Sequence, residues 1–107
     1  MSRQALGEFE HLTLLAILHL RRGAYGAAII DALEDRTGRD VSQAATYIAF
    51  KRLEEKGWID SRKGEPTERR AGRPRRYFRV TDLGREKLRE AREGLMNMWT
   101  GIVEQLG

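Results

Sequence analysis

The chain has 107 residues, enough for one domain with a small hydrophobic core. It contains no cysteine, which excludes disulfides, thiolate metal sites and thiol catalysis. The two histidines, His11 and His19, are too few for a histidine-built metal centre. No apolar run reaches the roughly 18 residues of a membrane span, and the N-terminus lacks a secretory signal. We therefore expect a soluble, cytoplasmic protein without a cofactor.

The positive charge of the chain is concentrated in one segment. The formal net charge is +4, from 20 Lys+Arg and 16 Asp+Glu. Residues 61–79 hold eight basic and two acidic side chains, a net charge of +6, so the rest of the chain carries −2. A localised basic patch is typical of a protein that binds a polyanion. A solvated charged loop is the alternative.

Three helices are predicted in the first half of the chain, over residues 8–20, 25–36 and 43–56. Apolar residues at helical spacing give each helix one face that fits a core. The first helix has a second apolar face with Leu14 and Leu18, and a helix that is apolar on two sides is usually buried on two sides. In so short a chain we expect another subunit to cover this second face.

The second half is predicted to form two strands, over residues 58–62 and 76–80, and a last helix over residues 82–105. Between the strands, residues 63–75 form a polar, basic loop. The apolar positions of the last helix repeat as a heptad-like seam of Leu88, Leu95 and Ile102, with Met98, Trp99 and Leu106 offset. This seam favours pairing with a second copy. Packing onto the chain's own core is the alternative.

This order of elements predicts a mainly α fold with a β-hairpin. Two short helices joined by a turn and followed by a hairpin are the parts of a winged helix-turn-helix. We expect residues 1–81 to form a DNA-binding winged helix-turn-helix domain. Residues 82–107 should form a C-terminal dimerisation helix that belongs to the same compact unit.

The third helix is the candidate recognition helix, because a helix fits the major groove of B-DNA and its N-terminal residues reach base edges. Its N-cap and its outward-facing residues are the candidate DNA contacts: Ser42, Gln43, Ala44, Tyr47, Ile48, Lys51 and Arg52. An ordinary amphipathic helix with a capped start would show the same pattern, so the helix alone does not decide the function.

The hairpin favours DNA binding more strongly. Five arginines crowd residues 69–76, and like charges so close repel one another, so we expect folding to gain nothing from them and phosphates to be their partners. A glycine lets the backbone approach a ligand, and a proline holds the chain extended. An arginine presented in this way can enter a narrow minor groove. The candidate contacts in the hairpin are Arg69, Arg70, Gly72, Arg73, Arg75 and Arg76.

Nearly the whole chain resembles the PadR-type transcriptional regulators. Residues 6–18 with Tyr25-Gly26 are similar to the opening of that family, and residues 42–59 to its recognition segment. The most specific match is residues 72–84, which resemble the family's wing strand and the entry into its last helix.

The resemblance implies a winged-helix domain with a single C-terminal dimerisation helix, acting usually as a repressor. Some members of the short subfamily bind flat, apolar drugs between the helices of the dimer, on a tryptophan of the last helix. Trp99 is the candidate for that role, and a buried interface aromatic is the alternative. Phe50 stands where the family more often has leucine, and the recognition helix has few polar side chains. We therefore expect specificity to depend more on the wing and on DNA shape.

The sequence thus predicts a homodimeric, sequence-specific regulator of transcription that binds double-stranded DNA and represses, with a small aromatic ligand as a further candidate partner. One alternative is a winged-helix module that binds proteins and not DNA, although such a module has little use for a hairpin of charge +6. An enzyme is the other alternative. No nucleophile–base pair, phosphate-binding glycine loop or metal-ligand spacing supports it, so we expect a protein that is not an enzyme.

Overall fold

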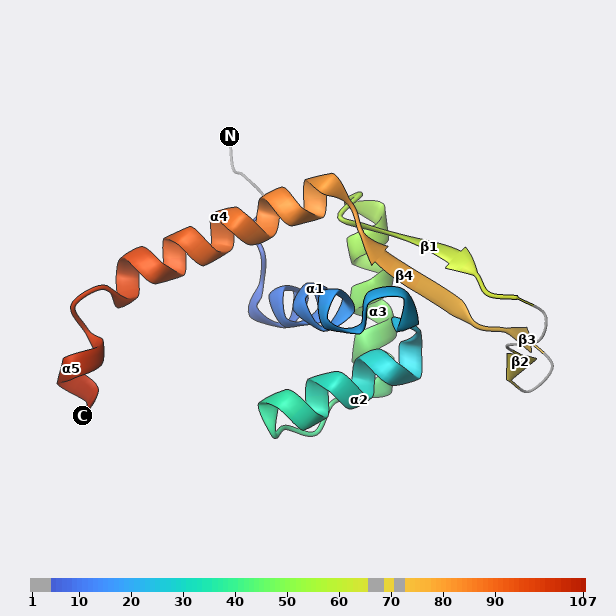
Figure 1. The fold of residues 1–107 in the computed structure, drawn as a ribbon, viewed down its shortest axis with the longest axis horizontal. Helices are drawn as coiled ribbons and strands as arrows, with labels where there is room; N and C mark the ends of the chain where they lie inside the picture. The colour runs from blue at the N-terminus through green and yellow to red at the C-terminus, as the bar shows by residue number, and fades with distance from the viewer. Residues whose placement is uncertain (1–4, 66–68, 71–72) are drawn as a thin grey trace.

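The computed structural model describes residues 5–65, 69–70 and 73–107. Four helices of at least three turns, a β-hairpin and short terminal pieces follow one another in the predicted order (Figure 1). The elements are α1 (Glu8–Leu20), the short 3₁₀ helix η1 (Arg21–Gly23), α2 (Gly26–Thr37), α3 (Gln43–Glu55), β1 (Ile59–Lys63), β2 (Arg69–Arg70), β3 (Arg73–Pro74), β4 (Arg76–Val80), α4 (Asp82–Trp99) and α5 (Val103–Leu106).

Helix α1 is at the centre of the molecule, where it contacts α2, α3, α4 and β4 (Figure 1). Its residues Leu14 and Ile17 are fully or almost fully buried and belong to the hydrophobic core cluster. Burial of one such side chain contributes about 1.5–3 kcal/mol. The prediction that Leu14 faces a second subunit is therefore wrong, because its side chain is 0% exposed within one copy. Leu18 is only partly buried and packs against the edge of the core.

Helices α2 and α3 form the helix-turn-helix. Helix α2 is capped at its C-terminal end by Gly38, whose φ of 71° is a left-handed conformation that glycine adopts without strain. In the following turn, the backbone N–H of Val41 donates to the carboxylate of Glu34 at 3.0 Å. The side chain of Ser42 then accepts from the N–H of Ala45 at 3.1 Å, so this serine is the N-cap that the sequence predicted.

We call the hairpin of strands β1 to β4 the wing. Its strands β1 and β4 are antiparallel, with Ile59 paired with Val80 and Lys63 with Arg76. Its inner face packs on α3, where the rings of Phe50 and Phe78 are 4.4 Å apart. The segment expected to be a simple loop contains a second short ladder between β2 and β3, which extends the hairpin outward. The ladder is formed by backbone N–H and C=O groups, so a polar, basic sequence does not prevent it.

Helix α4 follows β4 with a single intervening residue, Thr81. Its side chain accepts from the N–H of Gly84 at 3.1 Å and donates to the carbonyl oxygen of Gly57 at 2.6 Å. From this anchored first turn, the helix passes over α1, and its C-terminal end extends away from the body (Figure 1). None of the helices in the described part of the chain is long and apolar enough to cross a membrane.

The prediction of one continuous helix over residues 82–105 is wrong at the C-terminal end. Helix α4 stops at Trp99, and Gly101 has a φ of 83°, a conformation outside the right-handed helix. The hydroxyl of Thr100 bonds to the carbonyl oxygen of Met96 at 2.8 Å and completes the last turn. The apolar seam therefore continues into α5 in a new direction.

Candidate nucleic-acid interface

Helix α3 presents one face to solvent and the other to the core. Thr46, Ala49, Phe50 and Leu53 are buried. All seven candidate contacts of this helix are exposed: Ser42, Gln43, Ala44, Tyr47, Ile48, Lys51 and Arg52. The separation follows from the spacing of the buried residues at three and four positions, which places them on one side of the helix.

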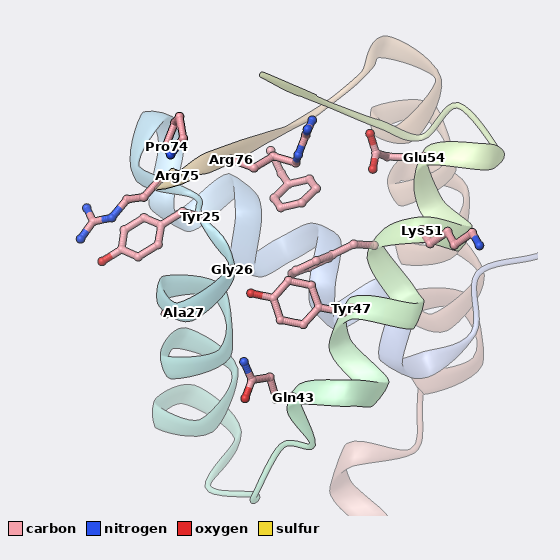
Figure 2. Close-up of a pocket in the computed structure, with 12 residues that line it drawn as sticks. Tyr25, Gly26, Ala27, Gln43, Tyr47, Lys51, Glu54, Pro74, Arg75 and Arg76 are labelled. Atoms are coloured by element: carbon pink, nitrogen blue, oxygen red, sulfur yellow. The ribbon is translucent and has the colours of Figure 1, made fainter. Parts of the chain in front are cut away.

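A cleft of about 780 Å³ lies between this face of α3, the start of α2 and the wing (Figure 2). We call it the α3–wing cleft. Its polar lining comes from Gln43, Tyr47, Lys51 and Glu54 of α3 and from Arg75 and Arg76 of the wing. The structure thus brings together predicted contacts that are more than 20 positions apart in sequence. Ala44, Ile48 and Arg52 lie on the surface of α3 outside the lining of this cleft.

The two wing arginines of the cleft also make contacts within the protein. The guanidinium carbon of Arg75 lies 4.1 Å from the ring centroid of Tyr25. Arg76 donates to the hydroxyl oxygen of Ser61 at 2.9 Å, and this hydroxyl donates to the carboxylate of Glu54 at 2.9 Å. The expectation that folding gains nothing from these arginines is therefore wrong for Arg75 and Arg76, because both are ordered by neighbours from other elements.

The other hairpin candidates lie farther out along the wing. Arg69 and Arg70 form β2 and Arg73 begins β3, so their backbones are part of the outer ladder. Gly72 lies outside the described residues.

Two residues at the start of α2, Tyr25 and Gly26, belong to the cleft, although the sequence analysis noted them only in the family resemblance and not as candidate contacts. Tyr25 stacks with Arg75, and the Cβ that an alanine would add at Gly26 would collide with the hydroxyl of Tyr47. Figure 2 shows the Tyr47 ring directed from α3 towards Gly26. The sequence signal for this site is an aromatic residue followed by glycine at a helix start, which permits close approach of a second helix.

A second, apolar groove lies on the other side of the molecule, between α1 and α4. It has a volume of about 490 Å³ and is lined by Leu15, Leu18, Leu88, Leu95, Met96 and Trp99, with His11, Arg85, Arg89 and Arg92. We call it the α1–α4 groove. Leu88 is only 8% exposed and belongs to the core. The prediction that it lies in the dimer interface is therefore wrong, because one copy of the chain already covers almost all of its surface. The large apolar side chains farther along α4 and α5 are exposed: Leu95, Met96, Met98, Trp99, Ile102, Val103 and Leu106.

Comparisons with known proteins agree with this geometry. A model of the transcriptional regulator PadR-like family matches residues 14–90. An uncharacterized protein from Lysinibacillus sphaericus is 30% identical over 94 residues, which cover 86% of this chain and 80% of that protein. The crystal structure of a PadR family transcriptional regulator from Eggerthella lenta is 30% identical, with a TM-score of 0.69 over 92% of this chain and 86% of the other.

A PadR-like transcriptional regulator from Bacillus cereus has the same fold at 22% identity, with a TM-score of 0.73 over 92% of this chain and 90% of the other. The mainly helical winged helix-turn-helix predicted from the sequence is therefore confirmed. Members of the matching family are transcription regulators and not enzymes, as the sequence predicted. The chain belongs to the PadR-like family of DNA-binding transcriptional regulators.

Proposed function

We propose that the chain represses transcription as a homodimer, by binding double-stranded DNA with α3 and the wing of each copy. The observation that carries this proposal is the α3–wing cleft. Exposed side chains of the helix and two arginines of the wing face the same space there. A helix and a flanking basic hairpin that converge in this way can contact two neighbouring parts of one duplex.

Each element has a separate task in this proposal. Helix α3 enters the major groove, where Ile48 can contact a thymine methyl group and Gln43 a base or a phosphate. Lys51 and the hydroxyl of Tyr47 bind phosphates, which position the protein without reading sequence. The outer wing, with Arg69, Arg70 and Arg73, follows the backbone into the adjacent minor groove, where a narrow groove strengthens the negative potential.

The test of DNA binding is a fluorescence-anisotropy titration with a duplex from the promoter region upstream of the protein's own gene, repeated at several salt concentrations. We expect affinity to fall steeply with salt, because each neutralised phosphate adds about −0.9 to the slope of log affinity against log salt. Lys51→Ala should weaken binding and reduce this slope by about one. Arg36→Ala is the control, because Arg36 is exposed at the end of α2 and outside the lining of the cleft. Binding that is independent of salt, or equal losses in the two variants, would refute the proposal.

The exposed apolar residues of α4 and α5 support the homodimer. A soluble protein rarely exposes so many large apolar side chains on one extended element without a partner. Leu95 lines the α1–α4 groove and is 53% exposed, and Met98, outside its lining, is 76% exposed. A second copy of α4 would cover this strip and the groove together.

We assign Trp99 chiefly to this interface and, as a second role, to an effector site. Trp99 is 47% exposed and lines the α1–α4 groove, so a flat aromatic compound could stack on its ring. Trp58 is almost fully buried, so ligand stacking should quench mainly the fluorescence of Trp99. In a cell-based reporter assay, such a compound should relieve repression. Quenching that persists in Trp99→Phe would place the ligand elsewhere.

A further inference from the structure

The segment just before α2 connects the wing to the helix-turn-helix. Tyr25 is the N-cap residue of α2, and its backbone forms an isolated antiparallel bridge with Tyr77 of β4. Beside it, the N–H of Phe78 donates to the carbonyl oxygen of Ala24 at 2.8 Å. These contacts join a strand of the wing to a residue about 50 positions earlier in the chain.

The side chains at this junction form a column in which two tyrosine rings lie between two arginines. At one end, the guanidinium carbon of Arg75 lies 4.1 Å from the ring centroid of Tyr25. The rings of Tyr25 and Tyr77 meet edge to face, with centroids 5.7 Å apart and an interplanar angle of 74°. At the other end, Arg62 stacks on Tyr77 at 4.7 Å. Both cations contact a ring within the distance at which a cation is attracted to an aromatic face.

The column holds Arg75 at the edge of the α3–wing cleft. Figure 2 shows the side chains of Arg75 and Tyr25 together on the side of the cleft opposite Lys51. An arginine loses much rotamer freedom when it binds a phosphate, and a side chain that is already ordered loses less. A guanidinium that stacks through its face can still donate hydrogen bonds from its edge.

We propose that Tyr25 is a positioning residue for DNA binding, because it holds the guanidinium of Arg75 in place for a phosphate before the duplex arrives. This inference rests on the proposed function. Tyr25 acts through Arg75, so its ring is the important part of its side chain and its hydroxyl is not.

A double-mutant cycle on the full chain tests this inference. The variants are Tyr25→Leu, Arg75→Ala and the double variant, with Tyr25→Phe as the matched control that keeps the ring. The probe is a fluorescein-labelled 30-base-pair duplex of random sequence, titrated at several salt concentrations. We expect Arg75→Ala to weaken binding severalfold and to reduce the salt slope by about one. Tyr25→Leu should reproduce both changes in part, Tyr25→Phe should bind as the wild type does, and the double variant should be no weaker than Arg75→Ala.

The outcomes separate this inference from the function on which it rests. If the wild type does not bind the duplex, or if Arg75→Ala binds as tightly, the proposed role of the wing fails and the inference fails with it. If Arg75→Ala weakens binding but Tyr25→Leu does not, only the positioning role is overturned. The positioning role is also overturned if the losses in the two single variants multiply in the double variant.

The melting temperature and helical circular dichroism of Tyr25→Leu are measured first, because this variant could lose affinity by unfolding. A second variant, Arg75→Lys, tests the inference with Tyr25 left in place. Arg75→Lys keeps the charge but replaces the planar guanidinium with an ammonium group that does not stack as a plane. We expect Arg75→Lys to bind the duplex severalfold more weakly than the wild type. Wild-type affinity in Arg75→Lys would overturn the inference, whatever the stability of Tyr25→Leu.

Discussion

Asp60 and Arg79 form a two-pronged ion pair across the wing, between partners in the β1–β4 register. Arg79 donates from Nε to Oδ1 at 3.0 Å and from Nη2 to Oδ2 at 2.6 Å. The pKa of the Asp60 carboxyl is lowered from 3.8, first because Arg79 donates hydrogen bonds to it. Slight burial opposes this shift, and the positive charge of Arg79 adds to it. Both side chains are largely exposed, so the pair is strongly screened by water.

We predict that Asp60→Asn lowers the melting temperature slightly at neutral pH and not in strong acid. A carboxyl whose pKa is lower in the folded state stabilises the fold above its unfolded pKa, and this contribution is lost as the pH falls through the folded pKa. The difference between the two proteins should therefore shrink as the pH falls below 3.8. Thermal melts monitored by circular dichroism at a series of pH values measure it. A difference that stays constant in acid would show that the substitution acts by a route other than loss of the carboxylate charge.

At the scale of the element, the attachment of α4 depends on one close approach. A Cβ at Gly84 would collide with the backbone carbonyl oxygen of Trp58 and press on the side chain of Val80. Because the obstacle is backbone, the helix itself would have to shift. By contrast, no heavy atom outside the helix lies within 4 Å of a Cβ at Gly94, which is in the same helix.

These two glycines should respond in opposite ways to alanine. We predict that Gly84→Ala lowers the free energy of unfolding by about 2–3 kcal/mol through overpacking. Gly94→Ala should raise it by up to about 1 kcal/mol, because alanine favours the helix more than glycine does. Urea denaturation of both variants at the same protein concentration measures the two changes. Equal effects would mean that contact with Trp58 is not what requires glycine at position 84.

The elements differ in how far the sequence could predict them. The spacing of apolar residues and the N-cap Ser42 were enough to predict where α3 begins and which face it buries, because both signals are local. Leu14 was placed wrongly, since a helix that is apolar on two sides does not reveal which side the chain itself covers. Tyr25 was not predicted as a site residue because its partners Arg75 and Tyr77 come from the wing, about 50 positions later in the chain. Gly101 was a sequence signal for the end of α4. The prediction passed over it because the heptad-like repeat of apolar residues continues beyond this glycine.

At the scale of the whole molecule, the α3–wing cleft and the exposed apolar strip of α4 and α5 are separate surfaces. We predict that Leu95→Glu prevents pairing without unfolding the winged helix-turn-helix, because Leu95 is 53% exposed and outside the core cluster. Sedimentation equilibrium should give the mass of two copies for the wild type and of one for the variant. Glu93→Gln, on the exposed surface of the same helix, is the control. A variant that still pairs would place the interface elsewhere.

The single residue between β4 and α4 has a consequence for the DNA that such a pair could occupy. Thr81 bonds to both Gly57 and Gly84, so the junction has no flexible linker that could change the angle between hairpin and helix. Two copies joined through α4 would hold their recognition helices at one separation and one rotation. The spacer between the two half-sites of an operator should then tolerate neither insertion nor deletion of a few base pairs, since a shift by half of the roughly 10.5-base-pair helical repeat turns one half-site to the opposite side of the duplex.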